Sequence, residues 1–221
     1  MTKEEFTLKI LLILKNEYPN SACALIYNSP IQLMIAARLS AQCTDIRVNA
    51  VTPALFQRFK TIYDFAECLP DELEEYIFPC GLYKTKAKDI IDMCQMVIKD
   101  FDGMVPDSIK ELITLPGVGR KTANLILGEI YGKPAVIVDT HFIRITKRLG
   151  FHNIKDPLKI EITMKDLLPE KDSTGFCHMV VMHGKAICTA IDPKCSKCPL
   201  KEFCKYYKET EKSKLSERNT I

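Results

Sequence analysis

The sequence has no long run of apolar residues and no segment that looks like a secretory signal. No stretch approaches the ~18 consecutive apolar residues that a membrane-spanning helix needs, although 47% of the 221 residues are hydrophobic. The start of the chain contains Glu4 and Glu5, and the apolar stretch Ile10–Leu14 is followed at once by Lys15 and Glu17. This is not the pattern of a signal peptide. We therefore expect a soluble, cytoplasmic protein in a reducing compartment, with a core that fills one large or two small domains.

Strand patterns are also nearly absent. Alternating β-branched residues occur only in the short stretch Ala135–Val138, and neither repeats nor low-complexity segments are present. Apolar residues recur instead at helical spacing, in segments separated by residues such as Pro53, Pro70 and Pro79. We therefore predict an all-α fold. The expected helices span residues 6–14, 32–39, 48–59, 62–67, 72–77, 84–99, 108–114, 120–131, 140–149, 159–168 and 173–188.

Positive charge is concentrated near the C-terminal end. The formal net charge is only +3, but residues 181–221 contain nine Lys or Arg and five Asp or Glu, so the rest of the chain is close to neutral. A basic region on a near-neutral body favours an anionic partner. From charge alone, a solvated tail explains the pattern equally well.

Residues 115–123, Leu-Pro-Gly-Val-Gly-Arg-Lys-Thr-Ala, lie between two predicted helices. Pro116 favours a turn, and Gly117 and Gly119 allow positive φ and close approach of another backbone. The next helix is expected to begin near Arg120, so its unpaired N–H groups and positive dipole end point into the hairpin. Such a helix start can bind a phosphate. Taken alone, however, Gly-x-Gly between helices is more often just a tight turn.

Lys121 makes a chemical role more plausible than a turn alone. In the first turn of a helix the dipole disfavours the charged ammonium, and an amine partly freed of its proton is what Schiff-base chemistry needs. The sequence Val-Asp-Thr-His follows at 138–141, where Asp139 could provide an acid–base partner. The structural alternatives are a phosphate contact for Lys121 and helix capping by Asp139 or Thr140. Neither motif decides between them.

Four of the ten cysteines form the most specific motif. Their spacing is Cys188-x6-Cys195-x2-Cys198-x5-Cys204, and clustered cysteines without a secretory signal favour metal ligands over disulfides. Structural zinc sites usually have two more widely separated Cys-x2-Cys pairs. The crowded spacing therefore favours an iron–sulfur cluster over zinc. The remaining cysteines are expected to be core residues: Cys23, Cys43, Cys68, Cys80, Cys94 and Cys177.

The hairpin, the Val-Asp-Thr-His motif and the cysteine spacing together resemble the endonuclease III family of helix-hairpin-helix DNA glycosylases. Two further segments, Leu39–Asp45 and Gly81–Tyr83, are similar to that family at the expected places, and the resemblance extends from about Leu12 to Tyr207. It implies a DNA glycosylase with abasic-site lyase activity and a 4Fe–4S cluster. The implied substrate is double-stranded DNA with damaged bases, chiefly oxidised pyrimidines, or abasic sites. The implied protein is a monomer that has no contact with membranes and is associated with a bacterial nucleoid.

The resemblance also implies roles for individual residues. Lys121 matches the nucleophile, which would form an imine with the sugar and cut the strand by β-elimination, and Asp139 matches the essential carboxylate. The four motif cysteines match the cluster ligands. The expected DNA-binding residues fall into three groups: Gln42 and Leu82, which enter the duplex; Gly117, Gly119, Arg120 and His141; and Lys194 and Lys197, which the cluster loop would present to phosphates.

The family's architecture implies a six-helix domain over residues 22–133 and a cluster domain made from 1–21 and 134–207, with the damaged base between them. A charged tail at 208–221 falls outside the resemblance. Cys43 departs from the family pattern, where Ala is expected. Two other functions stay open. Mismatch-specific adenine and thymine glycosylases share the fold but lack a lysine at position 121. A helix-hairpin-helix module that only binds DNA would leave Asp139 and the cysteines unexplained.

Overall fold

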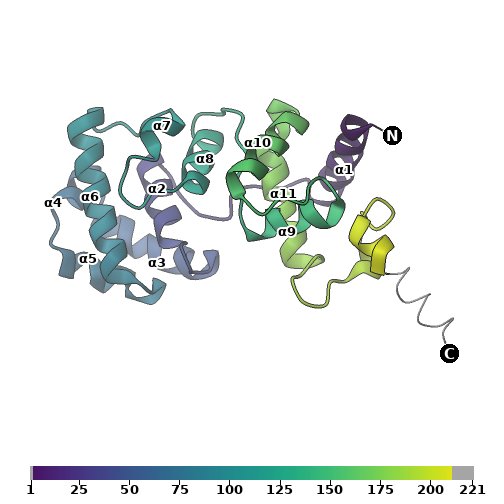
Figure 1. Cartoon of the computed structure of the whole chain (residues 1–221). Helices are drawn as coiled ribbons and strands as arrows, with labels where there is room; N and C mark the ends of the chain where they lie inside the picture. Colours follow the sequence, from purple (N-terminus) through teal and green to yellow (C-terminus); the bar gives the residue numbers. More distant parts are fainter. Residues whose placement is uncertain (1, 211–221) are drawn as a thin grey trace. The chain divides into compact units, whose positions relative to one another are not determined.

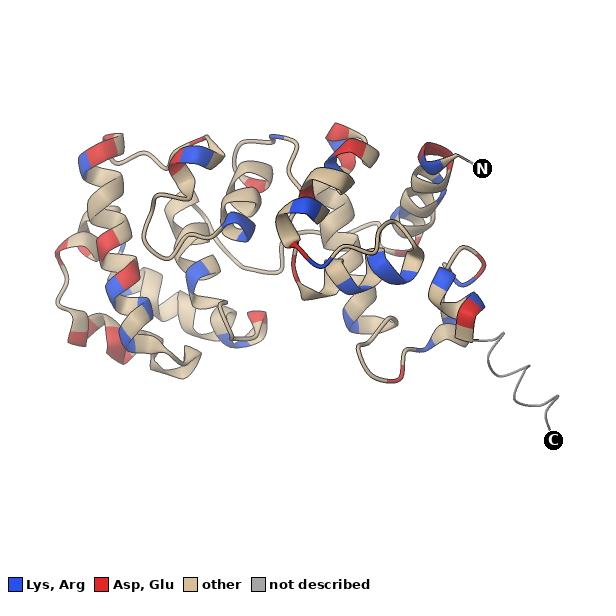
Figure 2. Ribbon diagram, in the orientation of Figure 1, with Lys and Arg blue, Asp and Glu red and all other residues tan. Residues whose placement is uncertain are grey.

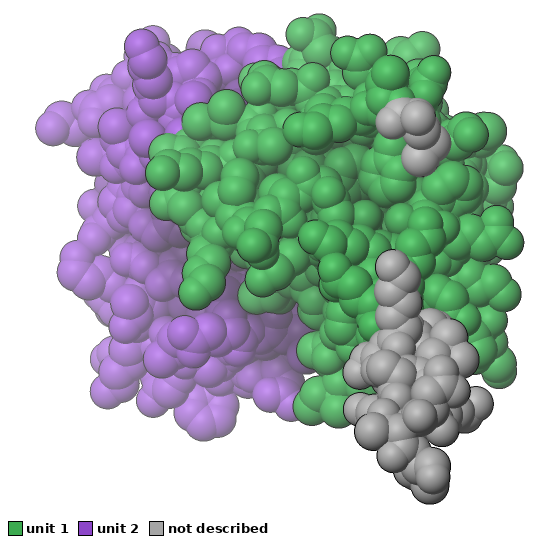
Figure 3. Space-filling model, turned by 45° about the vertical axis from the view of Figure 1, so that its right-hand side comes forward, with its two compact units in different colours: residues 1–22, 134–221 green, residues 23–133 purple. Residues whose placement is uncertain are grey.

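The computed structural model describes residues 2–210, and all regular secondary structure in that range is helical. This confirms the predicted all-α fold. Within the same range no helix is both long and apolar enough to cross a membrane. The chain divides into two compact units, shown in purple and green in Figure 3. The hairpin unit contains residues 23–133, and the cysteine unit contains residues 1–22 together with the chain from 134 onward.

The hairpin unit is built around α2, which begins at a strong helix-start signal. Ser29 accepts a hydrogen bond from the N–H of Gln32, and Pro30 occupies the first helical position, where no N–H is needed. Six of the ten residues of α2 are buried, and it packs against α3, α6 and α8 (Figure 1). The helices are α2 (Pro30–Leu39), α3 (Asp45–Arg58), α4 (Ile62–Glu67), α5 (Pro70–Ile77), α6 (Tyr83–Phe101), α7 (Ile109–Leu112) and α8 (Arg120–Glu129), with the 3-10 turn η1 (Phe78–Cys80).

Pro53 lies inside α3, as the predicted helix over 48–59 has it, and does not separate two segments. The buried residues Val48, Thr52 and Leu55 continue at helical spacing through it. Their burial offsets the backbone hydrogen bond that proline removes. Pro70, in contrast, is the first residue of α5, as the sequence pattern indicates.

The cysteine unit consists of α1 (Lys3–Glu17), α9 (Thr140–Leu149), α10 (Pro157–Leu167), α11 (Ser173–Ala186) and the 3-10 turns η2 (Glu170–Asp172) and η3 (Cys195–Lys197). The central helix is α11, which packs against both α1 and α9. The starts of α1, α9 and α10 again follow capping residues. The prediction began α10 at Lys159, whereas the helix begins at Pro157 because Asp156 accepts a hydrogen bond from the Lys159 N–H at 2.8 Å. Most of the predicted charged tail, 211–221, lies outside the described residues.

The one candidate strand, residues 135–138, pairs with a helix and not with another strand. Its residues Ala135, Val136 and Ile137 are buried, but the backbone N–H groups donate to side chains of α11. The Ala135 N–H donates to Ser173 Oγ at 3.1 Å, and the Ile137 N–H donates to Cys177 Sγ at 3.2 Å. Because these side chains satisfy the backbone, no partner strand is required.

Candidate functional site

The hairpin between α7 and α8 is held by its own buried residues. Leu115 and Val118 are 2% and 6% exposed, and the Val118 N–H donates to the Leu115 carbonyl at 3.1 Å. Gly119 forms the N-cap of α8, without a side-chain capping bond and without an acidic residue in the first turn of the helix. The positive end of α8 is therefore not compensated from within the helix. Lys121 is the second residue of α8 and is exposed.

The two hairpin glycines have different physical roles. Gly117 has a φ of +72°, and a Cβ there would lie 2.6 Å from Arg38 Cδ and 3.0 Å from Asp89 Cβ. Gly119 does not use the positive φ that glycine allows. Its φ is −89°, and a Cβ there would meet no atom of the chain within 4 Å. Gly117 is thus required by the fold, whereas no contact inside the described chain requires Gly119.

Arg38 and Asp89 form the ion pair against which Gly117 packs. The Arg38 Nε donates to Asp89 Oδ2 at 2.8 Å, and a second guanidinium nitrogen lies 2.6 Å from the same oxygen. Their side chains are 13% and 23% exposed, so the pair is largely shielded from solvent. It links α2 to α6 directly beneath the hairpin.

Gln42 and Leu82 share an unusual backbone conformation. Their φ angles are +54° and +50°, in the left-handed region that residues other than glycine rarely occupy. Both are exposed, Leu82 to 55%. The segments that carry them line one open pocket, which includes Gln42, Cys43, Cys80 and Gly81. Such backbone strain is typical of sites where function fixes the conformation.

Asp139 acts as the N-cap of α9, in the cysteine unit. One carboxylate oxygen, Oδ1, accepts a hydrogen bond from the Phe142 N–H at 2.7 Å. The structural role weighed from the sequence is therefore present, and it uses one of the two carboxylate oxygens. His141 lies in the first turn of the same helix, where its Nδ1 accepts from Arg144 at 3.1 Å.

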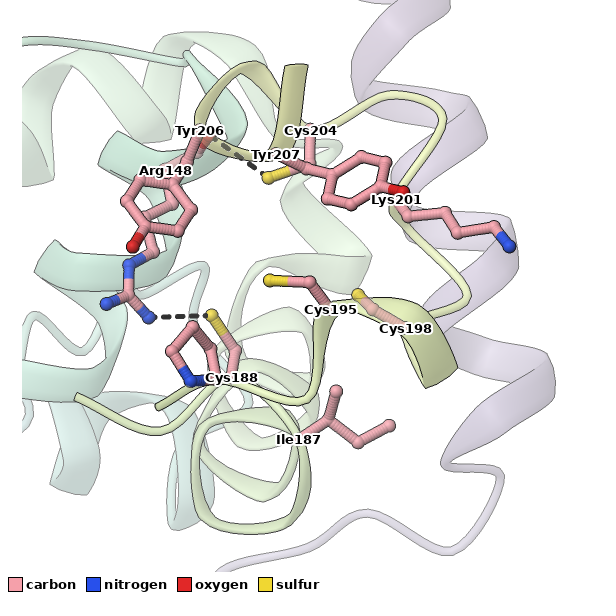
Figure 4. A pocket seen from close by; sticks show the side chains of 10 residues that line it. Arg148, Ile187, Cys188, Cys195, Cys198, Lys201, Cys204, Tyr206 and Tyr207 are labelled. Atoms are coloured by element: carbon pink, nitrogen blue, oxygen red, sulfur yellow. Dashed lines mark hydrogen bonds between the residues drawn. The ribbon is translucent and has the colours of Figure 1, made fainter. Parts of the chain in front are cut away.

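The four motif cysteines converge on one pocket (Figure 4). Cys188 follows α11, Cys195 begins η3, and Cys198 and Cys204 lie in the loop beyond it. Burial raises the pKa of the Cys198 thiol to about 11, and the negative charge of the neighbouring cysteines contributes less. Among the described residues, no three His, Cys, Asp or Glu side chains are grouped closely enough to hold a single metal ion.

Arg148 connects this pocket to α9. It lies in the last turn of that helix, one of the basic regions coloured blue in Figure 2. Its guanidinium donates to Cys188 Sγ at 3.3 Å and to the carbonyls of Thr189 and Ala190 at 2.7 and 3.0 Å. A cationic donor therefore faces one of the sulfur atoms and also orders the start of the loop.

A second polar connection reaches Cys198 from α11. Burial lowers the pKa of His183 to about 4, so the imidazole is neutral at pH 7. The Tyr18 hydroxyl lies 3.0 Å from His183 Nδ1, and His183 Nε2 lies 3.5 Å from Cys198 Sγ. If Tyr18 donates to Nδ1, the Nε2–H of the imidazole points at the sulfur.

A family model for the HhH-GPD superfamily, described as base excision DNA repair protein, matches residues 35–170. The chain belongs to this superfamily. It is 45% identical to Endonuclease III of Synechocystis sp. over 204 residues, which cover 92% of this chain and 93% of the relative. This similarity places it in the endonuclease III family.

Two solved structures extend the similarity to three dimensions. They are a non-covalent Endonuclease III–DNA complex and a trapped Endonuclease III–DNA covalent intermediate. Each has a TM-score of 0.90 and 38% sequence identity, and covers 96% of this chain and 99% of the other. The protein is accordingly a base excision repair DNA glycosylase with abasic-site lyase activity.

Sequence patterns missed several partly or fully buried residues of this endonuclease III-type protein that support the candidate site residues. Arg38, Lys86, Arg148 and His183 each contact a residue that is distant in the sequence. A lysine on a predicted helix is normally a surface residue. One signal was available for Lys86, which occupies the same helical face as the apolar residues Ile90 and Cys94.

Proposed function

We propose that Lys121 supplies the amine nucleophile of this glycosylase and lyase. The observation that supports the proposal is its position: an exposed lysine at the second residue of α8, beside an uncapped helix start that suits a phosphate. The Nζ lone pair would attack the sugar C1′, and the C1′–N bond to the base would break. The C1′–O4′ bond would then open to give the imine, with the two protons of the amine passing to the departing base and to O4′. Loss of the C2′ proton from the protonated imine would expel the 3′ phosphate, and water would finally release the lysine.

Asp139 is proposed to stabilise the positive charge that develops on the sugar. A carboxylate has two oxygens, and capping of α9 occupies only Oδ1. Capping and catalysis can therefore coexist in the same side chain. The cap has the further effect of fixing the carboxylate at a defined position relative to α9.

The residues that we propose to contact DNA lie on both sides of Lys121 in the sequence. The backbone N–H groups after Gly117 and Gly119 would bind a phosphate, with Arg120, His141, Lys194 and Lys197 as further contacts. Gly119 supports this assignment because no contact inside the described chain explains the missing side chain.

Gln42 and Leu82 are proposed to occupy the space that a flipped nucleotide leaves in the duplex. Flipping costs a few kcal/mol, and an exposed polar amide and an exposed apolar side chain on fixed backbones can offset part of that cost. We further propose oxidised pyrimidines as the preferred lesions. The protein would act as a monomer in the cytoplasm, at the nucleoid of a bacterium.

The cysteine pocket is proposed to hold a 4Fe–4S cluster. The residues suit that group: four soft sulfur donors converge on one pocket, and Arg148 donates to one of them. The cluster would supply a structural cross-link for the loop from residue 188 to residue 204. It takes no part in the imine chemistry proposed above.

Borohydride trapping tests the nucleophile. The unaltered protein should give a covalent adduct with DNA containing an abasic site, because borohydride reduces the imine. Lys121→Ala should bind the same DNA and give neither adduct nor strand scission. No adduct with the unaltered protein would contradict the lysine mechanism and favour a glycosylase that uses water.

Asp139→Asn separates the two roles of that residue. Asn caps helices about as well as Asp, so the thermal unfolding midpoint should stay within a few degrees while base excision falls by about 100-fold or more. Near-normal excision by Asp139→Asn would mean that Asp139 serves only as a cap.

A further inference from the structure

Lys86 is a buried lysine that no step of the proposed chemistry uses. Its side chain is fully shielded from solvent on α6. Burial lowers the pKa of the Lys86 ammonium, partly opposed by the nearby thiols of Cys43 and Cys80. Placing a lysine amine inside a protein is costly unless its N–H donors are paired. The position therefore demands a structural or functional explanation.

The partners of Lys86 are backbone carbonyls on two different segments. Its Nζ donates to the Leu39 carbonyl at 2.8 Å and to the Cys80 carbonyl at 3.0 Å. Leu39 ends α2, three residues before Gln42, and Cys80 ends η1, two residues before Leu82. One amine thus connects the backbone just before Gln42 to the backbone just before Leu82.

The backbone of Lys86 adds a third connection. Its N–H donates to the carbonyl of Leu82 at 3.0 Å in the first turn of α6. Leu82 and Gly81 both have positive φ, +50° and +69°, and no side-chain bond caps α6. This backbone bond is the ordinary first-turn bond of α6, which any residue at 86 would make, whereas the bond to the Cys80 carbonyl at the start of the strained turn comes from the lysine side chain.

We propose that Lys86 is a positioning residue that holds Gln42 and Leu82 at a fixed separation for entry into the duplex. This inference rests on the proposed insertion roles of those two residues. If the spacing of the two segments varied, the free energy of ordering them would be added to the cost of opening the duplex. With Lys86 in place they are ordered before DNA arrives.

The test compares Lys86→Met with Lys88→Met. Methionine has a similar length but no N–H donor. Lys88 lies on the same helix, is exposed and pairs only locally with Asp92, so its replacement removes the same charge without touching the two segments. Each variant is measured on a lesion-containing duplex and on a single-stranded abasic oligonucleotide, which needs no opening.

Lys86→Met should lower excision from the duplex by about 10- to 100-fold and leave borohydride trapping on the single strand within about twofold. A fluorescent adenine analogue opposite the lesion should report less unstacking. Lys88→Met should match the unaltered protein on both substrates. Equal losses on both substrates would overturn the proposal, because they would indicate general damage to the fold.

A double-mutant cycle separates this inference from the proposal on which it rests. In a Gln42→Ala, Leu82→Ala background, Lys86→Met should cause no further loss on the duplex, since its effect passes through those residues. A further 10-fold loss there would overturn the positioning role. Normal duplex opening by the Gln42→Ala, Leu82→Ala protein would instead refute the insertion roles themselves.

Lys86→Gln provides a second variant if Lys86→Met does not fold. Its amide keeps N–H donors on a shorter stem, so it can serve one of the two carbonyls. The same selective loss on the duplex is expected, of smaller size. An equal effect on both substrates would again count against the proposal.

Discussion

The hairpin of residues 113–119 and the cysteine loop of residues 188–204 are both short, irregular segments, but different forces fix their shapes. The hairpin is bounded by two helices, buries Leu115 and Val118, and rests through Gly117 on a shielded ion pair. The loop contains one three-residue turn, and Leu200 is its only buried apolar residue. The hairpin is therefore held by protein packing, whereas the loop is held by polar bonds and by the cluster proposed for its four sulfur atoms.

We expect the two segments to respond differently to substitution and to loss of a ligand. A segment held by packing keeps its conformation when a ligand leaves, because its apolar contacts are all internal. A segment held by metal ligation gains its folding free energy from the metal, and loses order with it. Substitutions in each segment can test this difference.

The largest effect is expected from Cys198→Ser. The unaltered protein should be yellow-brown with roughly four irons per chain, and the substitution should remove most of the colour and iron. Hydrogen exchange should accelerate across the cysteine loop and leave α8 protected. Cys68→Ser is a matched control, since Cys68 lies in the hairpin unit and donates only to a local carbonyl.

Full iron content in Cys198→Ser would contradict the ligand assignment. A colourless, active, unaltered protein that contains zinc would contradict the cluster itself.

A smaller effect is expected from alanine at the hairpin glycines. Gly117→Ala places a Cβ in the left-handed region and 2.6 Å from Arg38, which should lower the free energy of unfolding by about 2–4 kcal/mol. Gly119→Ala meets no atom and has ordinary φ, so stability should change by less than about 1 kcal/mol. Chemical denaturation measures both.

The two glycine variants also distinguish a loss of stability from a loss of DNA affinity. Gly119→Ala should weaken the affinity for abasic DNA despite its normal stability, because the new methyl group stands where a phosphate would approach. Unchanged affinity in Gly119→Ala would show that the phosphate does not lie against this residue.

The smallest effect concerns the charges of the cysteine loop. Each phosphate contact contributes about 0.9 to the slope of log affinity against log salt. Lys194→Ala with Lys197→Ala should reduce that slope by up to about 2 and weaken damaged and undamaged DNA alike. Lys194 already donates to the Ala186 carbonyl at 3.1 Å, so its share should be smaller than that of Lys197.

An unchanged slope in the double variant would mean that the loop does not touch the DNA backbone. The basic residues near the C-terminus would then be solvated charge, the alternative that the sequence left open.

Much of the molecule follows from the sequence alone, because its signals are local. Helical spacing predicts where most helices lie, and the spacing of four cysteines is enough to indicate that they share one role. Helix ends are predicted less well, since the cap at Asp156 starts α10 two residues before the predicted start. Packing decides the outcome where it overrides a local signal, and Pro53 stays within a helix because buried neighbours offset its lost bond.

Only the tertiary structure distinguished residues of the same type. Gly117 and Gly119 look equivalent in the sequence, yet contact with Arg38 and Asp89 makes one essential to the fold. Lys86 and Lys88 lie on one helix, but only Lys86 reaches carbonyls at residues 39 and 80. The physical reason is that a local pattern specifies backbone hydrogen bonds within a few residues, whereas burial and distant partners are determined by how helices pack.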